Sequence, residues 1–335
     1  MNSELLAKAF KAACMAELEA LKPGNVHIFA DGHGMTVHDF IASSDAVSAV
    51  IAQPDLSLGE RILHSVQATQ NAVGINTNLG MILLCAPIIE AQLNTHGTGL
   101  QANIHAVLSN TTINDAEACF AAIRLANPAG LGASDTHDVH APADCSLQIA
   151  MQQAADFDSI ARQYCNNFAD VFDGVAYYQK ILNLWQRPAW AATALHLHFM
   201  RHFLDSHIVR KQGETMAKLV QNEAAEHASE FTKNFNPKNY QSALMIFDVA
   251  LKKRGLNPGT SADLTVASLF LPPMMPASDS TWTSSAMTPT FSSTVTVLPL
   301  SSLRCSPALP QRTSSPPWIL SRSKMWLGRP CSNIT

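Results

Sequence analysis

The chain has 335 residues and a formal charge of −4, and 47% of its residues are hydrophobic. This length allows one large domain or two ordinary ones, with ample material for a core. The negative charge argues against a nucleic-acid partner, because proteins that bind by neutralising phosphates carry an excess of basic residues.

The cysteines and the apolar stretches indicate in which compartment the protein is expected. The seven cysteines form no CxxC pair and mostly lie in apolar runs, so we expect reduced thiols rather than disulfides or a zinc site. Charged residues interrupt the N-terminus, which therefore has no secretory apolar region. The longest apolar stretch, residues 81–89, is too short to span a bilayer. We expect a cytoplasmic protein without a membrane partner.

The first 270 residues are predicted to be a succession of helices. Residues 3–21 place apolar side chains near one face of a helix. Capping-box patterns begin further helices at Thr36, Ser57 and Thr112, each followed three residues later by an acid. Other helices are expected near residues 79–93, 145–155, 156–172, 188–204, 212–230, 239–254 and 261–270. No alternating strand pattern appears, so the prediction is all-α, with a single domain of roughly ten helices over residues 1–270.

Composition changes abruptly near residue 271. Residues 271–335 hold ten of the 18 prolines, fourteen serines and none of the 13 histidines, with one acid against five basic residues. Such a segment cannot bury enough apolar surface to offset chain entropy, so we expect it to be disordered. Two origins fit the change: a natural extension, or translation in a shifted reading frame. Tryptophans scattered among Ser, Thr and Pro favour the second.

Four polar segments interrupt the helices: residues 22–26, 74–80, 127–132 and 257–264. Each could be a purely structural loop, but together they supply amides, hydroxyls and backbone N–H groups, which bind polyphosphate. The last segment has a Pro-Gly turn before a helix start, where N–H groups point outward. None is a Walker A loop, because no Gly-Lys-Ser/Thr follows a strand. The candidate phosphate ligands in these segments are Lys22, Gly24, Asn25, Asn76, Asn78, Gly259 and Thr260.

A fifth segment, residues 205–211, concentrates positive charge. Arg210 and Lys211 lie beside His207 there, which indicates a local anion site, although a solvated and salt-bridged helix end has the same pattern. A magnesium ion could be shared by Asp170 and Asp173, which are three residues apart, and Asp138 or Asp158 could also bind it. Acids at helix ends more often serve the helix dipole, so the metal signal is less specific than the anion signal.

Taken in order, these segments resemble the triphosphoribosyl-dephospho-CoA synthase family. The matching stretches are residues 17–26, 74–80, 121–128, 158–162, 205–213 and 257–264, and the likeness covers residues 10–270. Characterised members of that family are all-helical and join ATP to 3′-dephospho-CoA with loss of adenine. The resemblance therefore implies an ATP-dependent triphosphoribosyl transferase that uses Mg²⁺ with its nucleotide and a CoA-like acceptor.

The likeness departs from the branch that serves citrate lyase at residues 76–80 and at residues 205–213, where that branch has a different, Asn-rich stretch. The branch that serves citrate lyase has Asn-Thr-His-Lys-Gly where this chain has Asn-Thr-Asn-Leu-Gly, so a His and a Lys that could meet phosphate or acceptor are missing. This chain looks more like the divergent branch of archaea and methylotrophic bacteria. Two alternatives stay open: a related transferase in tetrahydromethanopterin-linked one-carbon metabolism, and a non-catalytic helical protein that binds a nucleotide or CoA.

The family reaction is a displacement at C1′ of the ATP ribose, and it implies groups that hold the triphosphate. The resemblance assigns this task to basic side chains and to backbone N–H groups. The candidates are Lys22, Arg210, Lys211 and the N–H groups near Gly24 and Gly259.

The same reaction implies groups that act on the sugar, the base and the acceptor. A carboxylate would stabilise positive charge on the sugar, with Asp263 as the first choice and Glu17 as the second. Hydrogen bonds to ribose or base would come from Asn25, Asn76 and Asn78. One group must accept the proton of the acceptor hydroxyl and another must protonate adenine, and the candidates are Asp31, His33 and Asp138.

Overall fold

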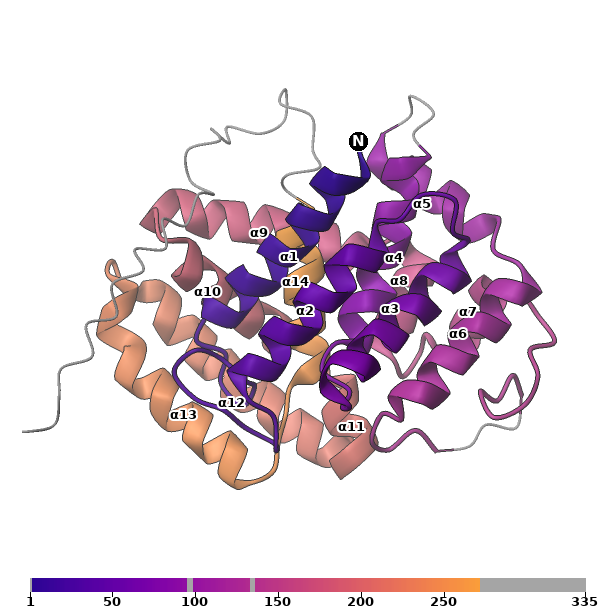
Figure 1. Cartoon of the computed structure of the whole chain (residues 1–335). Coiled ribbons are helices and arrows are strands. Elements are labelled where there is room, and N and C mark those ends of the chain that lie inside the picture. The colour runs from indigo at the N-terminus through magenta and orange to yellow at the C-terminus, as the bar shows by residue number, and fades with distance from the viewer. Residues whose placement is uncertain (1, 95–98, 133–135, 272–335) are drawn as a thin grey trace, which may run out of the picture. The chain divides into compact units, whose positions relative to one another are not determined.

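The computed structural model describes residues 2–94, 99–132 and 136–271, which all fall within one compact unit. This part of the chain contains fourteen α-helices, one 3₁₀-helix and no strand (Figure 1), so the all-α prediction is confirmed. The helices are α1 (Ser3–Glu19), α2 (Val37–Ile51), α3 (Leu58–Val73), α4 (Leu79–Leu93), α5 (Leu100–Ser109), α6 (Ile113–Ala126), α7 (Leu147–Ala154), α8 (Ser159–Asn166), α9 (Ala169–Trp185), α10 (Pro188–His202), α11 (Ser206–Gln212), α12 (Glu214–Lys233), η1 (Pro237–Tyr240), α13 (Gln241–Lys253) and α14 (Gly259–Phe270).

The structure has more helices than the roughly ten predicted, and the extra ones have local causes. α5 starts at Leu100 after the N-cap Gly99, which has no side chain to cap it, so its sequence lacks the capping pattern of the predicted helices. The helix expected over residues 156–172 is broken at Asn167 and Phe168, which adopt left-handed backbone angles (φ 55° and 61°), and this break separates α8 from α9. Gly213, with φ 85°, separates α11 from α12.

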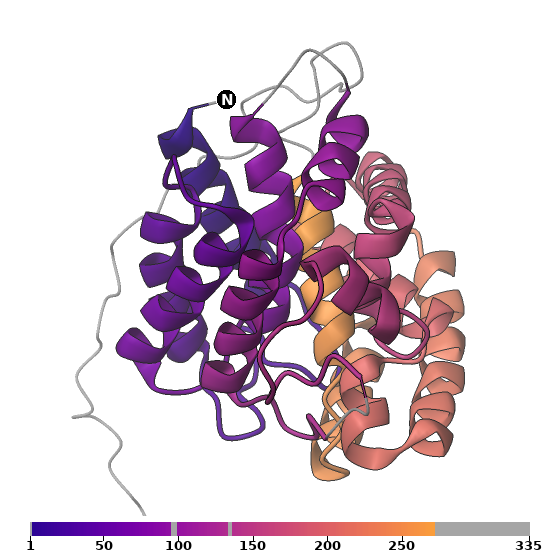
Figure 2. The ribbon, with the colours of Figure 1, turned by 90° about the vertical axis from the view of Figure 1, so that its right-hand side faces the viewer.

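α14 is the central helix of the fold (Figure 2). All of its residues except Gly259 and Asp263 are buried. It packs against α1, α4, α9 and α10. A helix that is apolar on nearly every side belongs in an interior, and the two positions of α14 that are only partly buried lie in its N-terminal half.

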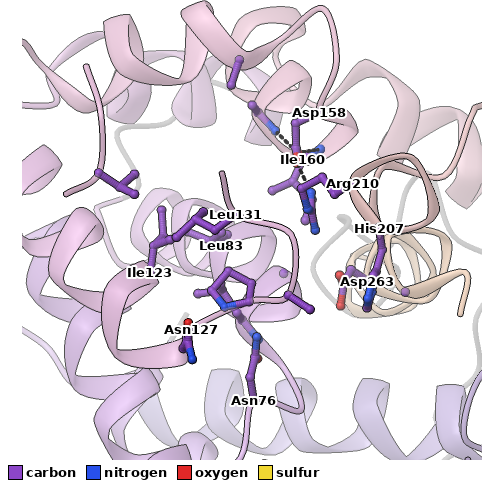
Figure 3. A pocket seen from close by; sticks show the side chains of 18 of the residues that line it. Asn76, Leu83, Ile123, Asn127, Leu131, Asp158, Ile160, His207, Arg210 and Asp263 are labelled. Atoms are coloured by element: carbon purple, nitrogen blue, oxygen red, sulfur yellow. Dashed lines mark hydrogen bonds and ion pairs between the residues drawn. The ribbon is translucent and has the colours of Figure 1, made fainter. Parts of the chain in front are cut away.

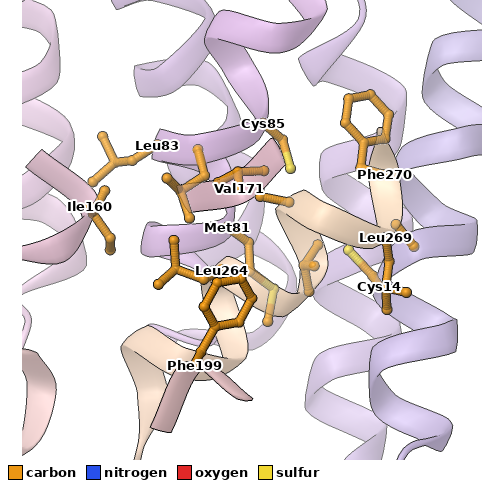
Figure 4. Close-up of a cluster of buried hydrophobic side chains, with 14 of the residues drawn as sticks. Cys14, Met81, Leu83, Cys85, Ile160, Val171, Phe199, Leu264, Leu269 and Phe270 are labelled. Carbon is orange, nitrogen blue, oxygen red and sulfur yellow. The ribbon is translucent and has the colours of Figure 1, made fainter. Parts of the chain in front are cut away.

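Apolar side chains from distant parts of the chain meet around α14 (Figure 4). Leu264 lies in one buried cluster with Cys14 of α1 and Phe199 of α10. Gly174 lets α9 approach closely, because a Cβ there would lie 2.5 Å from Oγ of Ser268. Close packing of this kind fixes α14 in place, and with it the polar residues at its start.

The three predicted capping boxes are all present. In each of them the N-cap hydroxyl accepts the N–H of the third helical residue, and the acid there accepts the N–H of the cap. Asp115 of the third box also accepts the N–H of Gly59 at 2.9 Å, which joins the start of α6 to the start of α3.

The predicted disordered tail, residues 271–335, lies outside the described residues apart from Leu271, which is buried. Its state and its origin therefore stay predictions. Within the parts of the chain that the structure describes, no helix is long and apolar enough to cross a membrane.

Candidate active site

A cavity of about 570 Å³ opens where the polar segments of the sequence converge. Its wall takes residues from the loop after α1, the start of α4, the loop after α6, α11 and the start of α14 (Figure 3). The fold thus brings together residues that are far apart in the sequence. The predicted site residues in the wall are Asn25, His33, Asn76, Asn78, Asp138, Arg210, Lys211, Gly259 and Asp263.

One buried carboxylate, that of Asp205, joins α11 to α14. Its Oδ1 accepts the N–H groups of His207 (3.0 Å) and Ile208 (3.2 Å) at the start of α11. Its Oδ2 accepts the N–H and the Oγ–H of Ser261, both at 2.8 Å, in the first turn of α14. Burial raises the pKa of Asp205, and the hydrogen bonds from Ser261 oppose that rise. Asp205 caps two helix N-termini at once, which satisfies donors that would otherwise lack partners.

His207 is held against the start of α14. Its N–H also lies 3.2 Å from Oγ1 of Thr260, and a Cβ on Gly259 would lie 2.5 Å from its Nδ1. Burial, together with the charges of Arg210 and Lys211, lowers the pKa of His207 to about 4, so its imidazole is neutral near pH 7. Thr260 itself is buried and outside the wall, where its hydroxyl joins the two helices instead of facing the cavity.

Asp263 lies in the cavity wall near the N-terminal end of α14 (Figure 3). It lies so close to α4 that a Cβ on Gly80 would be 2.0 Å from its Oδ2, so glycine is required there. Burial raises the pKa of Asp263 well above its ordinary value, and the charges of Asp205 and Glu17 raise it further. Within the described residues, no donor is hydrogen-bonded to its carboxyl. Burial and these neighbouring charges therefore favour the protonated form of Asp263 more than in a free aspartic acid.

Arg210 and Lys211 place positive charge beside this carboxyl. Nη1 of Arg210 is 2.6 Å from Oδ2 of Asp158, and the side chain of Arg210 keeps 28% of its surface exposed. The other oxygen of Asp158 caps α8. The loop after α6 approaches the backbone of Arg210 closely, since a Cβ on Gly130 would lie 2.7 Å from the Arg210 carbonyl oxygen. Arg210 is thus held by its neighbours while part of its side chain remains accessible.

Glu17 and Lys22 lie beneath the cavity, outside its wall. The ammonium of Lys22 pairs with Glu17 and also donates to the carbonyl of Val26 (2.6 Å) and to Oδ1 of Asn25 (3.3 Å). Burial lowers the pKa of Lys22 and raises that of Glu17, and each partner opposes the shift of the other. This placement gives Lys22 no contact with a ligand in the cavity. The pair supports Asn25, which does lie in the wall.

The loop after α1 is tied to the segment that precedes α14. The N–H of Gly24 donates to Oδ1 of Asp248 at 2.8 Å, and Nδ2 of Asn25 donates to Oδ1 of Asn257 at 2.8 Å. Gly24 has φ 83°, and a Cβ there would lie 2.7 Å from Cδ of Pro258. The N–H of Gly24 is therefore used within the fold.

The three candidates for proton transfer are separated by the fold. His33 lies in the wall with Nε2 2.8 Å from the carbonyl of Gly24, and burial lowers its pKa. Asp138 also lies in the wall, and its Oδ1 accepts the N–H of His140 at 2.7 Å. Asp31 is outside the wall and accepts the N–H of Val37 at 2.9 Å, at the start of α2. His33 and Asp138 therefore keep access to a ligand, and Asp31 supports a helix start.

Two asparagines lie in the wall at the start of α4. Oδ1 of Asn76 accepts the N–H of Leu79 at 3.1 Å, and Oδ1 of Asn78 accepts the hydroxyl of Thr69 at 2.8 Å. Each amide is thus oriented by a hydrogen bond within the fold.

The acids predicted to share magnesium do not form a site with the cavity. Asp173 is exposed on α9, and neither it nor Asp170 lies in the cavity wall. Oδ2 of Asp170 instead accepts hydrogen bonds from the side chains of Arg162, Gln163 and Asn166. In the described parts of the chain, one group of three side chains places its potential metal-ligand atoms within 4.8 Å of one another. The group consists of His137, Asp144 and Cys145.

The cavity has an apolar side as well as a charged one. In Figure 3, Leu83, Ile123 and Leu131 lie together, away from His207 and Asp263. Further apolar wall residues come from α6, α7 and the start of α8, among them Phe120, Met151 and Ile160. A cavity of this kind suits a ligand that has both anionic and uncharged parts.

Among the residues that shape the charged side, Asp205 was not a predicted site residue, Asp158 was predicted only as an alternative magnesium ligand, and His207 only as part of an anion site. Their segments had been singled out, but acids before a helix have the same pattern whether or not they face a cavity. The sequence signal that was present is the N-cap position, because Asp158 and Asp205 each directly precede a helix.

Comparison with known proteins now adds to this geometry. Residues 3–280 match the family of ATP:dephospho-CoA triphosphoribosyl transferases (CitG). Among solved structures, a protein from Archaeoglobus fulgidus, provisionally assigned as a triphosphoribosyl-dephospho-CoA synthase, superposes with a TM-score of 0.54 and 23% identity, covering 70% of this chain and 96% of that one. That similarity shows a shared fold. No curated protein sequence matches the chain. Because the family match spans most of its length, the chain belongs to the ATP:dephospho-CoA triphosphoribosyl transferase family.

Proposed function

We propose that the cavity is the active site of the family reaction, in which ATP and 3′-dephospho-CoA are joined and adenine is released. The observation that carries this proposal is the Asp263 carboxyl, which has a raised pKa and lies in one wall with Arg210 and Lys211. A polyphosphate nucleotide needs cations for its phosphates, and its base needs a proton as it leaves. Both groups are present in this wall.

The triphosphate would be held by Arg210 and Lys211. A guanidinium binds phosphate oxygens in pairs, and an ammonium adds a point charge. Lys22, Glu17 and the N–H of Gly24 are engaged within the fold, so they support the wall without touching the nucleotide.

Magnesium fits this site as a companion of the triphosphate. The ion takes oxygen ligands and usually binds one or two carboxylates together with substrate phosphates. Asp138 brings carboxyl oxygens to the wall, so it is the residue that would hold the ion together with the substrate phosphates. Bound there, magnesium would neutralise charge on the phosphates.

Asp263 would donate the proton that adenine takes up. In the reaction the bond from C1′ to the base breaks, the bond from C1′ to the acceptor oxygen forms, and the electron pair leaves with adenine. A carboxyl with a raised pKa can supply a proton near neutral pH. This role differs from the sequence-based prediction, in which an ionised Asp263 stabilises positive charge on the sugar.

The acceptor hydroxyl loses its proton in the same reaction. His33 and Asp138 are the two predicted bases that lie in the wall. Separate His33→Gln and Asp138→Asn variants distinguish them, because removal of the base lowers kcat about 10²–10⁴-fold, whereas loss of a binding contact mainly raises KM.

A related acceptor is the second candidate. Asn78 and Leu79 lie in the wall, at the two positions where the citrate-lyase branch has His and Lys. An uncharged pair there favours an acceptor with less negative charge at that point, such as a molecule of the pterin pathway.

The test is an incubation of the full chain with ATP, Mg²⁺ and dephospho-CoA, in which free adenine is measured. We expect adenine above a denatured-protein blank, and adenine and the joined product should form in equal amounts. Release only with a pterin-pathway acceptor would support the second candidate. Nucleotide binding without adenine release from any acceptor would contradict both and indicate a non-catalytic binding protein.

A further inference from the structure

The N-termini of α8, α11 and α14 meet beside the cavity, and each of these helices brings at least one charged group to its wall. Asp158 caps α8, Arg210 lies on α11 and Asp263 lies on α14. α8 has eight residues and α11 has seven. Helices this short are not stable alone, so their positions depend on the contacts that fix their ends.

The junction of the three helices is built on Asp205 and Ser206. The two oxygens of Asp205 accept hydrogen bonds from His207 and Ile208 on one side and from Ser261 on the other. The hydroxyl of Ser206 accepts the N–H of Ser159 at 2.9 Å, at the first residue of α8. Two consecutive side chains therefore hold the starts of α8, α11 and α14 together.

Asp205 is 5% exposed and Ser206 1%, and neither belongs to the cavity wall. A ligand in the cavity has no access to them. Any effect of Asp205 on the reaction must therefore pass through the residues that it holds in place.

We propose that Asp205 is a positioning residue for the transferase reaction, which holds the cation of α11 and the carboxyl of α14 in the arrangement that the substrates require. This inference rests on the proposed function of the cavity. A displacement of about 1 Å at a catalytic group can lower a rate by about 100-fold, so a junction of this kind controls the rate without contacting substrate.

The charge of Asp205 gives the proposal a second, electrostatic signature. The charged groups that act on Asp263 include Asp205, Glu17 of α1, Lys22 after α1, Arg210 of α11 and Asp158 at the start of α8, and the thiols of Cys14 and Cys85 also interact with it. Of these, Asp205 and Glu17 are the acids with the largest effect, and both raise the pKa of Asp263. Removal of the Asp205 charge lowers the pKa of Asp263. If kcat needs protonated Asp263, kcat of the variant therefore decreases at a lower pH than kcat of the wild type.

The test compares Asp205→Asn with a matched control, Asp115→Asn. Asp115 is also a buried carboxylate that joins two helix starts, since it accepts the N–H groups of Gly59 (2.9 Å) and Thr112 (2.8 Å), but it lies outside the cavity wall. Both variants lose a helix cap and should lose stability. We expect only Asp205→Asn to lower kcat, by about 100-fold, and to move the basic limb of the pH profile to lower pH.

Affinity for ATP, measured by calorimetry without acceptor, separates this inference from the proposed function. If the wild type releases no adenine with dephospho-CoA, Asp205→Asn should still weaken ATP binding while Asp115→Asn does not. Equal effects of the two variants on ATP affinity and on the pH profile would overturn the proposal.

Ser206→Ala keeps the proposal testable if Asp205→Asn fails to fold. This variant removes only the bond to Ser159, so it should fold and lower kcat by a smaller factor in the same direction. Unchanged kcat and unchanged ATP affinity in Ser206→Ala would also count against the junction.

Discussion

Two neighbouring regions of the molecule bury ionisable side chains in different ways. Beneath the cavity, Lys22 is fully enclosed and its ammonium is bonded to Glu17, Asn25 and Val26. In the cavity wall, Asp263 has no hydrogen-bond donor among the described residues, and the charge of Asp205 opposes its ionisation.

This comparison distinguishes an ion pair that stabilises the fold from a carboxyl that is available for catalysis. A buried ion pair whose partners are all supplied by the fold contributes to the fold and offers nothing to a ligand. A carboxyl that faces a cavity without a partner costs stability, and such a cost is common where a group takes part in catalysis.

The largest effect is expected for Asp263→Asn. This change removes the proposed proton donor, so kcat for adenine release should fall about 10²–10⁴-fold. The amide is nearly isosteric and carries no charge, so thermal stability should be equal to or above that of the wild type. Asp173→Asn, on the exposed face of α9, is the control and should leave both quantities unchanged. A stable Asp263→Asn variant with wild-type turnover would remove Asp263 from the mechanism.

Lys22→Met should mainly lower the stability of the fold. It leaves the Glu17 carboxylate buried without a partner, and breaking a buried pair in this way costs about 3–5 kcal/mol. Denaturant unfolding measures this loss. The double variant Glu17→Gln with Lys22→Met should recover part of the stability, since no uncompensated charge remains. Full stability in Lys22→Met would show that the pair is not the support inferred here.

Arg210→Gln should have a moderate effect on nucleotide binding. The change removes a cation from the wall and leaves Asp158 without its 2.6 Å partner. We expect the Kd for ATP to rise about tenfold or more, because a hydrogen bond to a charged group is worth about 1.5–3 kcal/mol. Arg254→Gln, which breaks an exposed pair with Glu223 away from the wall, is the control. Equal ATP affinities in both variants would place the phosphates elsewhere.

The smallest effect concerns the pH dependence of stability. The folded state raises the pKa of Asp263 above that of the unfolded chain, which is about 3.9. Its contribution is therefore fully present below about pH 4 and is lost as pH rises through the folded pKa. Wild type and Asp263→Asn should unfold with similar free energies near pH 4, and the variant should become relatively more stable as pH rises. A constant difference would mean that the pKa of Asp263 is not raised.

Much of the fold could be predicted from the sequence because its signals are local. The capping boxes at Thr36, Ser57 and Thr112 are formed as predicted, since side chain and backbone partners lie three residues apart. The break at Asn167 and Phe168 was missed because apolar residues continue across it. Asn167 ends α8 in a left-handed conformation that asparagine tolerates, whereas a left-handed Phe168 has no local signal.

The segments that form the site could be predicted from the sequence, but which of their residues face the cavity could not. Asn25 and Lys22 belong to the same loop, yet the fold places one in the wall and encloses the other. The loop is bonded to α13 and to the segment before α14, more than 200 residues away in the chain, so its placement has no local signal. The two-sided cap formed by Asp205 likewise needs the position of Ser261, which only the folded structure supplies.

The protonation state of Asp263 at neutral pH tests the central claim most directly. Infrared difference spectroscopy between the wild type and Asp263→Asn reports whether this carboxyl carries a proton. We expect a protonated carboxyl band near pH 7 that is absent from the variant and disappears from the wild type as pH rises. A carboxylate band for Asp263 at pH 7, in the protein without nucleotide, would contradict this expectation.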